Sequence, residues 1–144
     1  MNEMIDQRFE KATSEWVKLS VTEDELKSYL ITINEHHPLY TNKAVAKQAG
    51  YQDIPLPPAY PALFWQAFSL IWLKDQSHLI LTAQDFHYKK PLTINQSYDG
   101  QITLKKLLTR QKTQWAIHEL AIYQHSQIIA TIETTLLLNL GATK

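Results

Sequence analysis

Hydrophobic and polar positions change period along this chain of 144 residues, and each change predicts a different kind of element. Residues 16–21 alternate apolar and polar side chains, as a strand with one buried face does. Apolar residues of segment 26–33 then recur at helical spacing. Thr22 is a suitable cap for that helix, because Glu25 follows it three residues later as in a capping box. We therefore expect a strand followed directly by a capped helix.

A second short helix is predicted over residues 42–49, where Asn42 can cap its start and Gly50 can end it in a left-handed conformation. Four prolines between residues 55 and 61 follow and prevent regular structure until a third helix begins. Residues 59–73 are apolar on nearly every side, which in a soluble protein indicates a helix surrounded by other structure. We expect a sheet to wrap around this long central helix.

The second half of the chain has the pattern of strands, separated by short polar links. The predicted strands are 79–88, 98–109, 113–123 and 128–138. In the strand 98–109, Tyr98, Ile102, Leu104 and Leu108 share one face. Together with residues 16–21 this gives an α+β fold, with an antiparallel five-stranded sheet curled around one helix. We expect a single domain over residues 1–144, in which residues 1–15 form an N-terminal extension.

Composition excludes several classes of function. Lys plus Arg equals Asp plus Glu at 14 each, so no strong field is available to attract nucleic acid. The chain has no cysteine, and its six histidines lack the spacing of metal ligands, so we expect no metal site. Residues 59–73 fall short of the roughly 20 apolar residues that span a bilayer. The N-terminus is acidic and lacks the apolar run of a signal peptide, so we expect a soluble, cytoplasmic protein.

Three segments carry a resemblance to a known family. Residues 35–40 read Glu-His-His-Pro-Leu-Tyr, residues 49–58 read Ala-Gly-Tyr-Gln-Asp-Ile-Pro-Leu-Pro-Pro, and residues 84–91 read Gln-Asp-Phe-His-Tyr-Lys-Lys-Pro. In this order, and with this layout of elements, they resemble the hotdog fold of MaoC-like dehydratases, especially the N-terminal or FAS1-like dehydratase type. The resemblance extends over nearly the whole chain.

The resemblance implies a domain that binds an acyl thioester of coenzyme A or acyl carrier protein, without a further cofactor. Catalytic members add water to a trans-2-enoyl thioester or remove it from a 3-hydroxyacyl thioester. In this alignment Glu35 takes the place of the family's catalytic Asp, and Tyr40 takes the place of its His, while His37 offers an imidazole from a shifted position. Backbone amides of Ala59 and Tyr60 correspond to the donors that hold the thioester oxygen.

Each candidate residue also has a structural interpretation. Residues 35–37 are equally well explained as a solvated helix exit, where histidines favour the negative end of the helix dipole. Phe64 and Trp65 are acyl-pocket candidates, yet large aromatic side chains at helical spacing are most simply core residues. A tyrosine at position 40, with a reference pKa of roughly 10, is a poor base at neutral pH.

These considerations leave two main hypotheses for function. The first is a dehydratase or enoyl hydratase of acyl thioesters that uses Glu35 with His37 or Tyr40. The alternative is a non-catalytic subunit that binds the acyl group within a heteromeric dehydratase. A hotdog thioesterase ranks below both, because residues 59–73 contain no carboxylate. Under either main hypothesis we expect a homodimer, or a heterodimer with a related hotdog chain.

Overall fold

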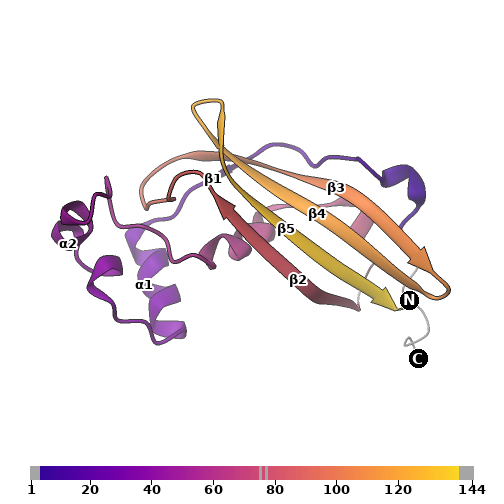
Figure 1. The fold of residues 1–144 in the computed structure, drawn as a ribbon, viewed down its shortest axis with the longest axis horizontal. Coiled ribbons are helices and arrows are strands. Elements are labelled where there is room, and N and C mark those ends of the chain that lie inside the picture. The colour runs from indigo at the N-terminus through magenta and orange to yellow at the C-terminus, as the bar shows by residue number, and fades with distance from the viewer. Residues whose placement is uncertain (1–3, 75, 77, 140–144) are drawn as a thin grey trace.

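The computed structural model describes residues 4–74, 76 and 78–139, and its main feature is one antiparallel sheet (Figure 1). The five strands follow the spatial order β1-β3-β4-β5-β2, and all four neighbouring pairs are antiparallel. Their bounds are β1 Val17–Leu19, β2 Leu79–Tyr88, β3 Tyr98–Arg110, β4 Thr113–Gln124 and β5 Gln127–Asn139. The predicted α+β fold with five antiparallel strands is therefore confirmed. The ends of the predicted domain, residues 1–3 and 140–144, lie outside the described residues.

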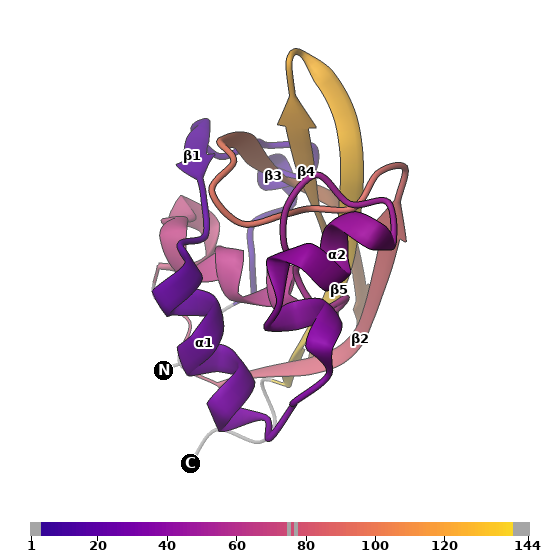
Figure 2. The same cartoon turned by 90° about the vertical axis from the view of Figure 1, so that its left-hand side faces the viewer.

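Two α-helices lie together at one end of the sheet, α1 over Glu23–Thr32 and α2 over Lys43–Gln48 (Figures 1 and 2). The predicted capping box is present: the Thr22 hydroxyl accepts the Glu25 amide at 3.1 Å, and the Glu25 carboxylate accepts the Thr22 amide at 2.9 Å. Asn42 caps α2 as predicted, and Gly50 follows that helix with φ at +100°. Local sequence signals therefore set both helices.

The prediction of one continuous helix over residues 59–73 is wrong. The segment forms two 3₁₀ helices, η3 over Tyr60–Ala67 and η4 over Ile71–Leu73, joined through extended backbone at Phe68 and Leu70. Pro61 explains the tight start of η3, because it has no amide hydrogen to donate to the Pro57 carbonyl four residues back. That carbonyl instead accepts the Tyr60 amide at 3.0 Å, which is a 3₁₀ hydrogen bond. Apolar composition predicted burial correctly but could not specify the hydrogen-bond pattern.

The core lies between one face of the sheet and the segment of η3 and η4, which runs along that face (Figures 1 and 2). A bulge in β3 between Leu104 and Lys106 shifts its pairing with β4 by one residue. One extra residue turns every later side chain to the opposite face. Leu107 is accordingly buried and Leu108 is 44% exposed, so the prediction that Leu108 shares the core face is wrong.

Residues 4–15 lie along β3 beyond its pairing with β1, from Ile102 onward, and reach the start of β4. The Lys11 amide donates to the Leu104 carbonyl, and the Ser14 amide donates to the Ile102 carbonyl at 2.7 Å. Ile5 is buried, and its backbone forms two hydrogen bonds with the side chain of Gln114 on β4, at 2.8 and 3.0 Å. This segment therefore packs on the same sheet as the rest of the chain.

Candidate functional site

The turn that follows α1 positions the first group of predicted site residues. Asn34 adopts φ of +57°, and the Glu35 amide donates back to the Leu30 carbonyl at 2.9 Å. The Asn34 amide donates to the Ile31 carbonyl at 3.1 Å, which completes a Schellman motif. The helix thus ends abruptly, and the chain turns at Glu35 into the short 3₁₀ helix η2, Pro38–Tyr40.

Glu35 and His37 both cap this turn. The Glu35 carboxylate accepts the backbone amides of His36 and His37, at 3.0 and 3.1 Å. The Nδ1 atom of His37 accepts the Leu39 amide at 3.0 Å and so caps η2. Both side chains therefore accept hydrogen bonds from the local backbone, in line with the structural interpretation of residues 35–37.

Tyr40 is the member of the predicted trio that reaches a cavity. Its side chain is half-buried, and its ring packs edge-on to the His37 ring at 6.1 Å between centroids. Burial, and secondly the negative charge of Glu35, raise the pKa of the Tyr40 hydroxyl above its usual value. At neutral pH this hydroxyl keeps its proton, so it can donate a hydrogen bond but cannot act as a base.

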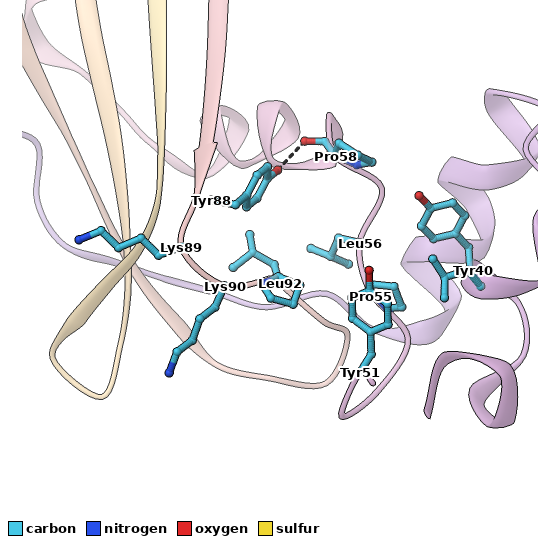
Figure 3. A pocket seen from close by; sticks show the side chains of 11 residues that line it. Tyr40, Tyr51, Pro55, Leu56, Pro58, Tyr88, Lys89, Lys90 and Leu92 are labelled. Carbon is cyan, nitrogen blue, oxygen red and sulfur yellow. Dashed lines mark hydrogen bonds between the residues drawn. The ribbon is translucent and has the colours of Figure 1, made fainter. Parts of the chain in front are cut away.

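The cavity at Tyr40 has a volume of about 310 Å³ and lies between the helical end of the molecule and the loop after β2 (Figure 3). Apolar side chains form most of its wall: Leu39, Pro55, Leu56, Pro58, Pro91 and Leu92. The polar groups of the lining belong to Tyr40, Tyr51, Tyr88, Lys89 and Lys90. We refer to this space as the apolar cavity. A mostly apolar lining with a few polar groups is typical of small-molecule sites.

Tyr88 joins two segments of the wall of the apolar cavity through a hydrogen bond. Its hydroxyl donates a hydrogen bond to the Pro58 carbonyl, which Figure 3 shows as a dashed line. Burial raises the pKa of Tyr88 to about 12, with a smaller contribution from Tyr29. The hydroxyl of Tyr88 therefore donates its hydrogen bond to the backbone, whereas the hydroxyl of Tyr40 on the opposite wall is protonated and can donate a hydrogen bond elsewhere.

The remaining predicted residues lie outside the lining of this cavity. Glu35, His37, Ala59 and Tyr60 are not among the described residues that line it. The Tyr60 amide, expected to be unpaired, donates to the Pro57 carbonyl at 3.0 Å. The Ala59 amide has no hydrogen-bond partner among the described residues. Of the two predicted oxyanion donors, Ala59 therefore has the amide that is open to a ligand.

Phe64 and Trp65, the acyl-pocket candidates, face the core. Phe64 is buried and packs edge-on to Tyr60, with 6.0 Å between ring centroids. Trp65 packs edge-on to His118 at 5.1 Å. The prediction did not include Tyr51 and Tyr88, whose segments carried the family resemblance, because the sequence pattern does not say which side chains of a loop or a strand end face a cavity.

His118 on β4 is fully buried, and none of the ion pairs among the described residues involves it. The indole nitrogen of Trp72 can only donate, and it donates to Nε2 of His118 at 2.9 Å. The ring proton of the neutral imidazole therefore lies on Nδ1, which donates to the Ala116 carbonyl at 3.2 Å. Burial lowers the pKa of His118 to about 4. His118 thus joins the η3–η4 segment to the sheet as a neutral group.

Within the described residues no three His, Cys, Asp or Glu side chains are grouped as metal ligands would be. Among the helices that the structure describes, none combines the length and the apolar character needed to cross a bilayer.

A protein-family model described as the FAS1-like, dehydratase domain region matches residues 10–117, well over half of the chain. The chain belongs to this family. Membership of the FAS1-like dehydratase family confirms the resemblance to MaoC-like dehydratases. A curated relative of this family member, the UPF0336 protein of Thermobifida fusca (strain YX), is 33% identical over 78 residues. The match covers 50% of this chain and 51% of that protein, so the chain spans about half the length of that relative.

Solved structures share the fold of this FAS1-like dehydratase family member at low sequence identity. The C-terminally truncated HadBC (3R-hydroxyacyl-ACP dehydratase) complex from Mycobacterium tuberculosis aligns with a TM-score of 0.81 at 12% identity, over 90% of this chain and 97% of that chain. The (R)-hydratase from A. caviae involved in PHA biosynthesis aligns with a TM-score of 0.69 at 13% identity, over 91% and 98%. The ChsH1–ChsH2 complex from M. tuberculosis aligns with a TM-score of 0.74 at 15% identity, over 92% and 87%. These alignments identify the fold as the hotdog fold.

Proposed function

We propose that this chain binds an acyl thioester of coenzyme A or acyl carrier protein in the apolar cavity, as the binding subunit of a heteromeric dehydratase. One observation carries the proposal: the described lining combines apolar walls with tyrosine hydroxyl groups and contains no carboxylate or imidazole. Removing water from a 3-hydroxyacyl thioester requires a base for the α-proton and an acid for the departing hydroxyl. The apolar cavity is equipped to hold a thioester rather than to supply that base.

The hydroxyl of Tyr40 is the polar group best placed to orient such a ligand. Its raised pKa keeps it protonated, so it can donate a hydrogen bond to a thioester carbonyl. The hydroxyl of Tyr88 already donates to the Pro58 carbonyl and holds the opposite wall in place. The cavity therefore offers the Tyr40 hydroxyl as a donor in a mostly apolar space, which is a common composition for small-molecule sites.

Pairing with a second hotdog chain is supported by the exposed edge of the sheet. Strand β2 spans ten residues at one edge, and Ile80 and Leu81 on it are 52% and 54% exposed. An edge strand with exposed apolar residues favours pairing with another chain. Two of the structurally similar proteins, HadBC and ChsH1–ChsH2, were themselves solved as complexes. We infer that a related chain completes this edge and supplies the catalytic imidazole.

A second candidate function, an enoyl hydratase that uses Glu35 with Tyr40, is favoured by a specific observation. The negative charge of Glu35 is, after burial, the second cause of the raised pKa of Tyr40, so the carboxylate acts electrostatically on that hydroxyl. A water held between the two side chains would have a carboxylate to take its proton. In this candidate function the thioester would enter the apolar cavity and meet that water at its mouth.

One assay separates the two functions. Crotonyl-CoA is added to the purified chain, its binding is measured by calorimetry, and its turnover is followed as loss of enoyl absorbance and as thiol release. We expect binding without turnover of either kind. Loss of enoyl absorbance would refute the non-catalytic role, thiol release would indicate a thioesterase, and lack of binding would refute the proposal altogether.

The variant Glu35→Gln tests the second candidate directly. A glutamine keeps an oxygen that can accept the His36 and His37 amides, so the turn should persist. If Glu35 is the base, the variant should lower hydratase turnover roughly 10²–10⁴-fold. The matched control is Glu15→Gln, at an exposed glutamate of the N-terminal segment. A change below about tenfold, equal to that of the control, would show that Glu35 is only a turn residue.

A further inference from the structure

A second cavity, of about 340 Å³, adjoins the apolar cavity and differs from it in chemistry. Its polar lining includes Lys90, His125 and the side-chain amides of Gln52, Gln96 and Gln124, and the hydroxyl-bearing residues Tyr51, Thr93 and Tyr98 also line it. We refer to it as the polar cavity. No carboxylate is found among the described residues that line either cavity. The polar cavity is therefore a space with donors and a fixed positive charge but no competing anion.

The two cavities share a wall. Tyr51, Lys90 and Pro91 line both of them, so the two cavities adjoin at these residues. Figure 3 shows the Lys90 side chain pointing away from Leu92 and out of the apolar cavity. The ammonium of Lys90 is thus directed away from the apolar walls, at the junction of an apolar and a polar space.

Some polar groups that line the polar cavity already have hydrogen-bond partners within the part of the protein that the structure describes, and other donors do not. The Tyr98 hydroxyl accepts the Thr93 amide at 3.0 Å and donates to the Thr93 carbonyl at 3.4 Å, so this part of the wall is satisfied. The Gln124 amide group donates to the Gln96 side-chain oxygen at 3.2 Å. This bond fixes the orientation of Gln96 and leaves its N–H donors without a partner among the described residues. Lys90 likewise has no ion pair among the described residues.

We propose that the polar cavity binds the phosphate group on the pantetheine arm of the thioester whose acyl group occupies the apolar cavity. This inference rests on the proposed function, because it assigns the two ends of one ligand to two adjoining cavities. A phosphate is an anion with several acceptor oxygens, and an ammonium with amide N–H donors is matched to it in charge and hydrogen bonding. Coenzyme A and the prosthetic arm of an acyl carrier protein both carry this phosphate.

The test compares ligands that differ only in phosphate content. Dissociation constants are measured by calorimetry for crotonyl-pantetheine, crotonyl-phosphopantetheine and crotonyl-CoA, with the intact chain. We expect the phosphorylated arm to bind at least about tenfold more tightly than crotonyl-pantetheine, and added salt to reduce the ratio. The variant Lys90→Gln should bring that ratio close to one, whereas Lys112→Gln, at the exposed turn between β3 and β4, should leave it unchanged.

The outcomes are distinguishable from those of the proposed function. Equal binding of the phosphorylated and unphosphorylated arms would overturn the phosphate site and leave thioester binding intact. An equal loss of the ratio in Lys90→Gln and Lys112→Gln would overturn it as well, because the effect would then come from net charge. Binding of none of the three thioesters would overturn both. If the phosphate site holds, crotonyl-CoA binding more tightly than crotonyl-phosphopantetheine would indicate coenzyme A as the carrier. Crotonyl-CoA and crotonyl-phosphopantetheine binding equally tightly would indicate the arm of an acyl carrier protein.

Discussion

Mild acid should destabilise this protein through one buried imidazole, that of His118. Burial lowers its pKa in the folded state from 6.5 to about 4, whereas the unfolded chain titrates near 6.5. Below pH 6.5 the unfolded state therefore binds one more proton than the folded state, and the free energy of unfolding falls as the pH falls. The loss begins near pH 6.5 and is complete near pH 4. Its size over that interval is about 3 kcal/mol, from about 1.4 kcal/mol per pH unit.

The assay is urea unfolding followed by tryptophan fluorescence at several pH values between 7.5 and 4.5. The variant His118→Gln removes the titrating group and keeps a side-chain oxygen that can accept the Trp72 indole N–H. We expect the free energy of unfolding of the variant to depend less steeply on pH, by up to about 1.4 kcal/mol per unit. The matched control is His125→Gln, at an exposed histidine in the turn between β4 and β5.

Parallel pH profiles for the wild type and His118→Gln would refute this reasoning. They would mean that His118 becomes protonated without loss of structure, or that acid acts through other groups. A flatter profile in the control His125→Gln would also count against it, because the effect would then not be specific to the buried imidazole.

Two further predictions concern packing and capping. Gly100→Ala should destabilise the fold by about 1–3 kcal/mol, because an added Cβ would lie 2.5 Å from Leu19 Cδ1 and 3.2 Å from Phe68 Cζ; an unchanged urea midpoint would show that these side chains yield freely. Thr22→Ala should cost about 1 kcal/mol, because it removes the hydroxyl that accepts the Glu25 amide. A loss below about 0.3 kcal/mol in the same unfolding experiment would mean that the rest of the capping box suffices.

Elements with a local physical cause could be predicted from the sequence. The capping box at Thr22, the Asn42 cap and the left-handed Gly50 depend on residues within a few positions of one another. The alternation of β5 likewise fixed which of its faces is buried, since Ile132 and Leu138 are fully buried. Such signals act within one element, so no knowledge of its neighbours was needed.

The sequence could not predict the details that depend on neighbouring strands and backbone. Leu107 and Leu108 are adjacent leucines, and only the bulge after Leu104 decides that the first is buried. The residues 59–73 were expected to form one helix, but Pro61 removes a donor and the segment bends between η3 and η4 to follow the sheet. Periodicity cannot report either event, because each depends on hydrogen bonds between specific pairs of residues.

The candidate site, like the fold, could be predicted from the sequence only in part. The sequence predicted site residues within the segment 35–40, and in the structure Tyr40 lines the apolar cavity whereas Glu35 and His37 cap the backbone of the turn. Tyr51, Tyr88 and Lys90 were missed because they come from separate loops and a strand end, far apart along the chain. Only the folded chain brings them around common cavities.

By itself, the sequence determined the class of the fold and the family, because the order of strands and helices follows from periodicity, caps and turn residues, and the family from its motifs. The tertiary structure decided which polar groups remain available for chemistry. The carboxylate of Glu35 and the imidazoles of His37 and His118 are groups of the kinds that catalytic sites use. Their hydrogen bonds, burial and distance from the apolar cavity determine whether they can act on a ligand, and these quantities exist only once distant segments have packed together.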